Sequence, residues 1–340
     1  MVVNKRINRT SSNLLLFAAM LCVFTAGGCK EELTITDPLG KPKPAKLKHV
    51  AEQILRDALT DTDPQIRAKA VEVVVAVKQK RMMPRVQKLL LDEYVPVRFA
   101  AAVAVGDMEY YLARNTLEKL LKVPDENTKL GAAYALYKLG YKKYLEPIRK
   151  AVLSDDQTVR ANAVVLLGKS GEPDVLKLLY WAKDDDYSEP KVRYQAAEAI
   201  ARLGDEKITS KLWTMLISKF VDNKIIGIRA MGALGTREAK EVLQTKLDDD
   251  ILEVRLAAAE QLGMLGDTSG QGVVISVFDE GFTQGLEPEG YERVMVLTAL
   301  AIGRIDTPVV TKYLPKLIED KSKLVRLAAA QAALLSKSVR

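Results

Sequence analysis

The sequence predicts an all-α protein, an α-solenoid of about nine stacked two-helix repeats that fills most of the 340-residue chain. Three observations lead to this prediction. An Ala-rich segment with helical periodicity recurs from about residue 50 onward, a second amphipathic segment follows it, and no alternating strand pattern or hairpin signal interrupts them. Because one helix pair cannot bury its apolar face alone, the repeats are expected to stack into one elongated, right-handed core with atypical ends.

Each Ala-rich segment follows an acidic turn and carries a basic residue near its start. This basic residue occupies the same position in every repeat, and we call that position the register position. A representative copy is DDQTVRANAVVLLGKSG at residues 155–171, and the first three intervals between register positions are each 31 residues. The positions assigned from the sequence are Arg67, Arg98, Lys129, Arg160, Arg193, Arg229, Arg255, Arg293 and Arg326. A catalytic ion pair is needed once, whereas a helix cap or an inter-repeat ion pair is needed at every joint. The recurring acids and bases are therefore interpreted as structural.

The pattern D-x-x-V-R-x-x-A-A-x-A-L-x-x-L-G resembles that of HEAT repeats, and more narrowly the short bacterial variety found in phycobilisome-lyase-like families. The resemblance covers about residues 50–338. It implies a stack of helix pairs in which the second, amphipathic helix of each unit lines the concave face. The pattern specifies how repeats stack, so the resemblance implies almost nothing about a catalytic or binding activity.

The N-terminus has the pattern of an export signal. Lys5, Arg6 and Arg9 precede a 12-residue apolar run, LLLFAAMLCVFT at residues 14–25, which is too short to span a bilayer as a stable helix. The run ends in the small residues 26–28, directly before Cys29. This segment resembles the lipobox of bacterial lipoproteins, although Ala26 replaces the usual Leu. The resemblance implies cleavage before Cys29 and acylation of that residue, for example with palmitate.

Three regions follow from this interpretation. We expect a lipoprotein signal peptide at residues 1–28 that is removed, a lipidated Cys with a flexible Lys/Pro tether at residues 29–49, and the solenoid at residues 50–340. The alternative is a free secreted protein, since the residues before Cys29 also fit an ordinary signal cleavage site.

The residue after Cys29 bears on which membrane the protein is attached to. In some Gram-negative bacteria an Asp at this position signals retention in the inner membrane, and here the residue is Lys30. The expected location is therefore the periplasmic side of the outer membrane.

Composition excludes several classes of site. The chain has two Cys, Cys22 and Cys29, and one His, His49, so catalytic triads, Cys/His zinc sites and His-ligated iron sites are excluded from the repeats. Removing residues 1–28 removes three basic residues and no acidic one, which lowers the formal charge from +7 to +4. Such a weak positive charge does not indicate nucleic acid as a partner. No metal, cofactor or small-molecule substrate is expected.

Two sets of residues are candidates for binding a partner. Lys recurs at one position of the second helices, and this stripe is expected to lie on the concave face, where it would attract an acidic partner or is simply solvated near helix C-termini. The stripe consists of Lys88, Lys119, Lys150, Lys177, Lys246 and Lys316. Large apolar residues also occupy solvent-tolerant positions of repeats two to four. Phe99, Tyr134 and Tyr137 among them form a predicted docking patch or fill wide gaps between repeats.

Two loops interrupt the periodicity. The insertion at residues 279–290 contains Phe282, a further candidate for recognition, or it is a tolerated insertion without a role. The acidic loop at residues 184–190 clusters carboxylates but lacks the ligand spacing of a calcium loop, so we expect no metal there.

Together these features predict a membrane-anchored, non-enzymatic protein-interaction scaffold of the bacterial cell envelope. Its partner is expected to be another envelope protein. The alternatives are an enzyme subunit, a lyase- or chaperone-like HEAT protein, or a passive envelope spacer. HEAT-like hydroxylases hold iron with His-Glu pairs, and this chain has no His beyond His49.

Overall fold

The computed structural model describes residues 43–338, and every regular element in that range is helical. These residues belong to one compact unit. The predicted signal peptide at residues 1–28, the predicted lipidation site Cys29 and the first part of the predicted tether lie outside the described range. Within it, no helix is long and apolar enough to cross a membrane.

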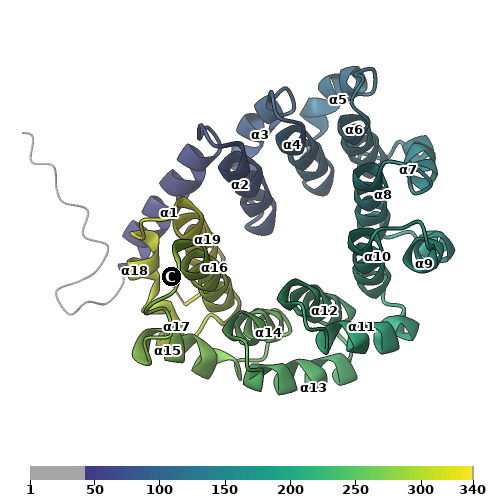
Figure 1. Ribbon diagram of the computed structural model, residues 1–340. Helices are drawn as coiled ribbons and strands as arrows, with labels where there is room; N and C mark the ends of the chain where they lie inside the picture. The colour runs from purple at the N-terminus through teal and green to yellow at the C-terminus, as the bar shows by residue number, and fades with distance from the viewer. Residues whose placement is uncertain (1–42, 339–340) are drawn as a thin grey trace, which may run out of the picture. The chain divides into compact units, whose positions relative to one another are not determined.

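Nine long, mostly Ala-rich helices form an inner layer (Figure 1). They begin after acidic or polar turns, and the carboxylates of Asp63, Asp125 and Asp156 accept hydrogen bonds from the first free backbone N–H groups of their helices. The inner helices are α2 (Pro64–Ala76), α4 (Val95–Asp107), α6 (Glu126–Lys138), α8 (Gln157–Ser170), α10 (Pro190–Arg202), α12 (Val221–Leu234), α14 (Leu252–Met264), α16 (Pro288–Ile305) and α19 (Lys323–Leu335).

Shorter helices form the outer layer, and each one precedes its inner partner in the chain (Figure 1). Short 3₁₀ segments lead into α3, α5, α7, α9 and α11. The outer helices are α1 (Pro44–Ala58), α3 (Met83–Leu89), α5 (Arg114–Leu120), α7 (Leu145–Ala151), α9 (Leu176–Asp184), α11 (Thr209–Leu216), α13 (Arg237–Thr245), α15 (Gln271–Asp279), and α17 (Pro308–Thr311) with α18 (Leu314–Ile318). The described residues thus form nine antiparallel units, which confirms the predicted all-α solenoid.

Consecutive inner helices contact one another through very small residues. A Cβ atom added to Gly168 of α8 would lie 2.6 Å from the Cβ of Ala199 in α10. Cβ atoms added to Gly106 and Gly303 would likewise lie 2.9 and 2.6 Å from the Cα atoms of Ala135 and Ala332. The outer helices carry bulkier Leu, Ile and Val at their buried positions. Because the inner layer is drawn together more closely than the outer layer, the array curves with the Ala-rich helices on its concave side.

The curvature brings the last helix back to the first. Helix α19 packs against α1 and α2 (Figure 1). Leu327 of α19 belongs to the core of the first repeats, while Leu47 and Ala51 of α1 belong to the core of the last repeats. The Lys323 ammonium lies 2.8 Å from an Asp61 carboxylate oxygen across this seam. The two ends of the solenoid therefore seal each other, in place of the atypical ends expected from the sequence.

The tether boundary expected from the sequence is wrong by several residues. Helix α1 begins at Pro44, and not near residue 50, so the second half of the predicted Lys/Pro segment at residues 29–49 is partly helical. Proline is compatible with the first turn of a helix, since its N–H group is not needed there. Burial of Leu47 against the last repeats supplies the stabilisation that the isolated segment lacks.

A ladder of cations and carboxylates joins successive repeats. The Arg67 guanidinium donates to the carbonyl oxygens of Asp61 and Thr62 and forms an ion pair with Asp92 of the next repeat at 2.8 Å. Arg160 pairs in the same way with Asp185 at 2.6 Å. Arg67 and Arg160 thus form ion pairs between repeats, as the sequence predicts for these positions.

Two register positions assigned from the sequence are wrong. Lys224, and not Arg229, is the fourth residue of α12, and it pairs with Asp249 at 3.0 Å. In α16 the fourth residue is Tyr291, and not Arg293; its hydroxyl donates to Asp320 at 2.7 Å. The Ile-Arg dipeptide ending at Arg229 resembles the Val-Arg pair found near the start of other inner helices. Because α12 already begins at Val221, this dipeptide lies in the middle of the helix.

The first prediction tests the close contact of the inner helices. Replacing a helical Gly by Ala normally stabilises by up to about 1 kcal/mol. Gly168→Ala should instead lower the free energy of unfolding, because its new methyl group would overlap Ala199. Gly272→Ala in α15 is the matched control, since no atom lies within 4 Å of its added Cβ. Urea denaturation measures both; equal stabilisation by the two substitutions would contradict the packing argument.

The second prediction concerns acid denaturation. Burial alone would raise the pKa of Asp92, but the hydrogen bonds from Arg67 and from the Tyr94 backbone hold it below the ordinary value of 3.8. The ionised Asp92 carboxylate therefore contributes its full share of the free energy of unfolding above about pH 4. This contribution is lost as the pH falls through the lowered pKa of Asp92. Asp92→Asn should cost about 3 kcal/mol at pH 7, and the deficit should shrink in more acidic solution.

Urea titrations from pH 7 to pH 2 measure this effect. The control is Glu241→Gln, whose partner Arg237 is 93% exposed and whose loss should cost less than about 0.5 kcal/mol. A deficit for Asp92→Asn that does not change with pH would argue against the pairing.

Candidate functional site

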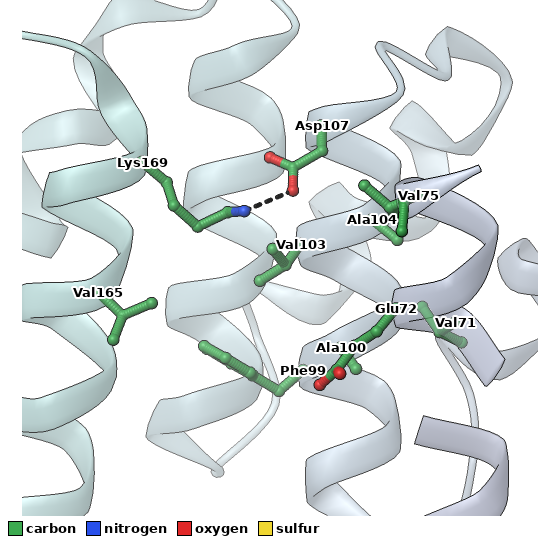
Figure 2. Close-up of a pocket in the computed structure, with 11 residues that line it drawn as sticks. Val71, Glu72, Val75, Phe99, Ala100, Val103, Ala104, Asp107, Val165 and Lys169 are labelled. Carbon is green, nitrogen blue, oxygen red and sulfur yellow. Dashed lines mark ion pairs between the residues drawn. The ribbon is translucent and has the colours of Figure 1, made fainter. Parts of the chain in front are cut away.

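The described part of the chain contains an apolar pocket on the concave side of the array. It has a volume of about 360 Å³, within the range of about 300–1,000 Å³ that is typical of ligand pockets. Helices α2, α4 and α8 provide its walls (Figure 2). The lining residues are Val71, Glu72, Val75, Ala76, Phe99, Ala100, Val103, Ala104, Asp107, Val165 and Lys169.

No residue of α6 lines this pocket, although α6 lies between α4 and α8 in the chain. Phe99 extends from α4 toward Val165 of α8 (Figure 2). The ring of Phe99 can lie there because Gly131 is the residue of α6 beneath it; a Cβ atom at Gly131 would come within 3.3 Å of the ring. The half-buried side chains of Phe99, Val103 and Val165 therefore form an apolar surface without being covered.

Charged groups border this apolar surface at one end. The Lys169 ammonium of α8 lies 2.8 Å from Asp107 of α4, so an ion pair connects helices on either side of α6 (Figure 2). The Tyr134 hydroxyl donates to the same Asp107 carboxylate at 2.6 Å. Burial raises the pKa of Tyr134 far above its ordinary value, and the Asp107 charge raises it further. The tyrosine consequently remains a neutral hydrogen-bond donor that fixes Asp107.

The predicted aromatic patch is only partly present. Phe99 lines the pocket, as do Val103 and Val165. Tyr134 and Tyr137, by contrast, are 0% and 4% exposed, so neither can dock a partner directly. Tyr137 fills the gap between repeats and donates its hydroxyl hydrogen to Glu172. Both tyrosines therefore belong to the core, and the predicted docking patch does not include them.

The predicted position of the lysine stripe is wrong. All six residues lie on or directly after outer helices, on the convex side of the array. Lys88, Lys119, Lys150, Lys177 and Lys316 are exposed there, whereas Lys246 is half-buried and lies 3.6 Å from Asp249. The sequence alignment identified the repeated position correctly but placed it on the wrong face, because the small residues of the Ala-rich helices decide which layer is concave.

The loop candidates lie away from the pocket. Phe282 is 39% exposed, in the connection between α15 and α16, with the Arg255 guanidinium 5.3 Å from its ring centre. The inserted segment is shorter than the sequence indicated, since residues 288–290 already belong to α16. Among the described residues, no three His, Cys, Asp or Glu side chains are arranged to hold a metal ion.

The third prediction tests how Asp107 is held at the border of the pocket. Tyr134→Phe removes the hydroxyl but leaves the ion pair between Asp107 and Lys169, so it should lower the free energy of unfolding by about 1 kcal/mol. Tyr111→Phe is the control, because Tyr111 is 61% exposed and should tolerate the change within about 0.5 kcal/mol. Equal stability of the two variants would mean that the hydroxyl does not contribute.

Comparisons with known proteins identify the family. A sequence comparison with curated proteins gives no match. The chain resembles human deoxyhypusine hydroxylase solved in complex with glycerol, with 17% identity, a TM-score of 0.35 and coverage of 87% of this chain and 98% of that one. It also resembles the complex of CpcE and CpcF of phycocyanin lyase from a Nostoc species, with 20% identity, a TM-score of 0.44 and coverage of 73% and 93%.

The family model described as HEAT repeats matches three overlapping stretches, residues 52–136, 114–189 and 145–223. These stretches together cover just over half of the chain, and the observed helix pairs continue the same architecture to residue 335. The chain belongs to the HEAT-repeat family.

Proposed function

We propose that this protein is a non-enzymatic interaction scaffold of the bacterial cell envelope that receives an apolar segment of a partner protein in its concave pocket. The observation that carries the proposal is the half-buried apolar surface of Phe99, Val103 and Val165, which the helices form but leave uncovered. Solenoids of stacked repeats generally bind partners on extended concave surfaces. An uncovered apolar patch of this kind is typical of a binding site.

The chemistry of the pocket favours a large apolar side chain as the group that is bound. Its central walls are aliphatic and aromatic, so burial of an apolar group there provides the main favourable free energy. Glu72 and the ion pair of Asp107 with Lys169 lie at its border, where they can hydrogen-bond to the backbone or polar side chains of the same partner.

The proposal assigns no catalytic residue, cofactor or metal. Several of the cations that recur along the chain pair with a carboxylate of the next repeat, as Arg67 does with Asp92, Arg160 with Asp185 and Lys224 with Asp249. The single histidine, His49, is exposed on α1. The alternatives of an enzyme subunit and of a passive envelope spacer become outcomes of the experiment below.

The envelope location rests on the N-terminal sequence alone. A basic segment, a short apolar run and small residues before Cys29 support export and lipidation of that residue. Several acyl chains on one residue would give stable attachment to the membrane, where a single chain would not. We place the protein on the periplasmic side of the outer membrane, since Lys30 follows Cys29.

The fourth prediction tests the pocket and the anchor together. After gentle cross-linking, the intact lipoprotein is purified from the membrane fraction, and mass spectrometry analyses both its N-terminus and its bound proteins. Val165→Trp should fill the pocket and reduce recovery of the partner at least tenfold. Gln331→Trp, at the equivalent position five residues after the register residue of the last repeat, should leave recovery unchanged.

A Cys29→Ser variant separates the anchor from the pocket. It should abolish acylation and move the protein to the soluble fraction, while the pocket itself remains intact. An unmodified Cys29 in the natural protein would overturn the anchor. A lipidated protein that recovers no stoichiometric partner would indicate a passive spacer, and recovery of an enzyme whose activity depends on the chain would indicate an enzyme subunit.

A further inference from the structure

The two edges of the array differ in chemistry. One edge contains the turns that lead from each outer helix to its inner partner, and all of them except the turn at residues 217–220 contain acidic residues; we call it the acidic edge. Most of the large apolar side chains that are exposed in the described turns also lie on this edge. They are Leu91, Tyr94, Leu153, Tyr187, Ile217, Phe220, Phe282 and Leu286, whereas Tyr111, Leu112 and Val309 lie at the opposite edge. The turn between α9 and α10 combines both properties most strongly.

This turn is held rigidly. The Gln157 side chain donates to the Tyr187 carbonyl at 3.1 Å and accepts from the Glu189 N–H at 3.0 Å. Ser188 is 3% exposed, and Arg160 donates to its hydroxyl at 3.2 Å. The loop is therefore fixed to the preceding repeat, yet the Tyr187 side chain is 85% exposed. A tyrosine that a fixed loop presents to solvent makes no contribution to the core.

A second pocket of about 430 Å³ lies beside Tyr187. Three aromatic side chains and three carboxylates line it, namely Tyr180, Trp181, Tyr187, Asp184, Asp185 and Asp186. We propose that this pocket binds the cationic side chain of a lysine or arginine in a basic segment of a protein partner. The inference rests on the proposed interaction function, but it concerns a separate site with different chemistry.

The arrangement of charges supports a cationic ligand. Asp185 already pairs with Arg160 at 2.6 Å, and Asp184 pairs with Lys183. Asp186 is fully exposed and lies 3.7 Å from Arg193, so its carboxylate remains accessible to an incoming cation. Arg160 and Lys183 already lie over the rings of Trp181 and Tyr180, each 5.6 Å from the ring centre. Tyr187, which is 85% exposed, therefore provides the main aromatic surface for an incoming cation. Aromatic faces attract cations, and a nearby carboxylate strengthens that attraction.

A protein segment fits the site better than an isolated cation. The neighbouring turn between α7 and α8 adds Asp155 and Asp156, which would attract a further basic residue of an extended segment. Exposed Ile217 and Phe220 in the next turn provide apolar contacts for the intervening side chains. The concave pocket beside Phe99 is lined by other helices, so the two sites can be occupied and tested independently.

Trp181 allows the site to be observed directly. The chain has two tryptophans, Trp181 and Trp213, so a full-length Trp213→Phe protein reports through Trp181 alone. Titration with a peptide of alternating lysine and glycine should give a saturable change in fluorescence that weakens with added salt. The same peptide with acetylated lysines, which has the shape but lacks the charge, should bind at least tenfold more weakly.

Matched variants assign the binding to individual residues. Tyr187→Ala should weaken binding of the lysine peptide about tenfold, and Asp186→Asn should weaken it several-fold and reduce its salt dependence. Tyr111→Ala and Glu238→Gln, which are exposed at the opposite edge, should have no effect. Equal binding of the acetylated peptide, or unchanged binding by Tyr187→Ala, would overturn the proposal. Neither result would change the outcome expected for the concave pocket. That pocket is tested separately, by comparing how much partner protein the natural chain and the Val165→Trp variant recover.

Discussion

The close approach of the inner helices is the constraint on which the rest of the architecture depends. Gly168 against Ala199, and the equivalent contacts of Gly106 and Gly303, leave no space for even one additional carbon atom. These contacts shorten the inner layer relative to the outer layer, whose consecutive helices are not packed closely against one another. The resulting curvature brings α19 against α1, and the two terminal repeats then cover the apolar faces that would otherwise be exposed to solvent.

The same geometry explains where the chain has uncovered surface. Along most of the inner layer, positions that face the concave side carry polar residues such as Glu72 and Glu198, or are covered by neighbouring helices. Around α6 this pattern fails, since Gly131 lets Phe99 lie across the helix and Leu130 and Tyr134 are drawn into the core. An apolar pocket remains between α4 and α8. Its position follows from a local departure from the repeat, and binding sites in regular folds commonly arise from such departures.

The charged residues divide into a structural group and an accessible group. Arg67, Arg160 and Lys224 pair with aspartates of the following repeat and are held in the turns, where they align one unit on the next. Asp186 and the outer lysines such as Lys88 remain accessible to solvent. Because the structural group neutralises itself, the accessible group sets the electrostatic character of each surface: the acidic edge is negative, and the convex side carries the lysine stripe.

The sequence by itself determined the helical class, the number of repeats and the structural role of their charged joints. Apolar periodicity and the recurring acidic turn are local properties, so they can be read without knowledge of contacts. The sequence also identified Phe99 as a departure from the repeat. The tertiary structure decided which helix layer is concave, that α1 begins at Pro44, that Lys224 and Tyr291 take the register positions, and that Tyr134 and Tyr137 are buried. These features depend on how closely neighbouring helices approach and on contacts between residues more than 250 positions apart, such as Asp61 and Lys323, which no local pattern encodes.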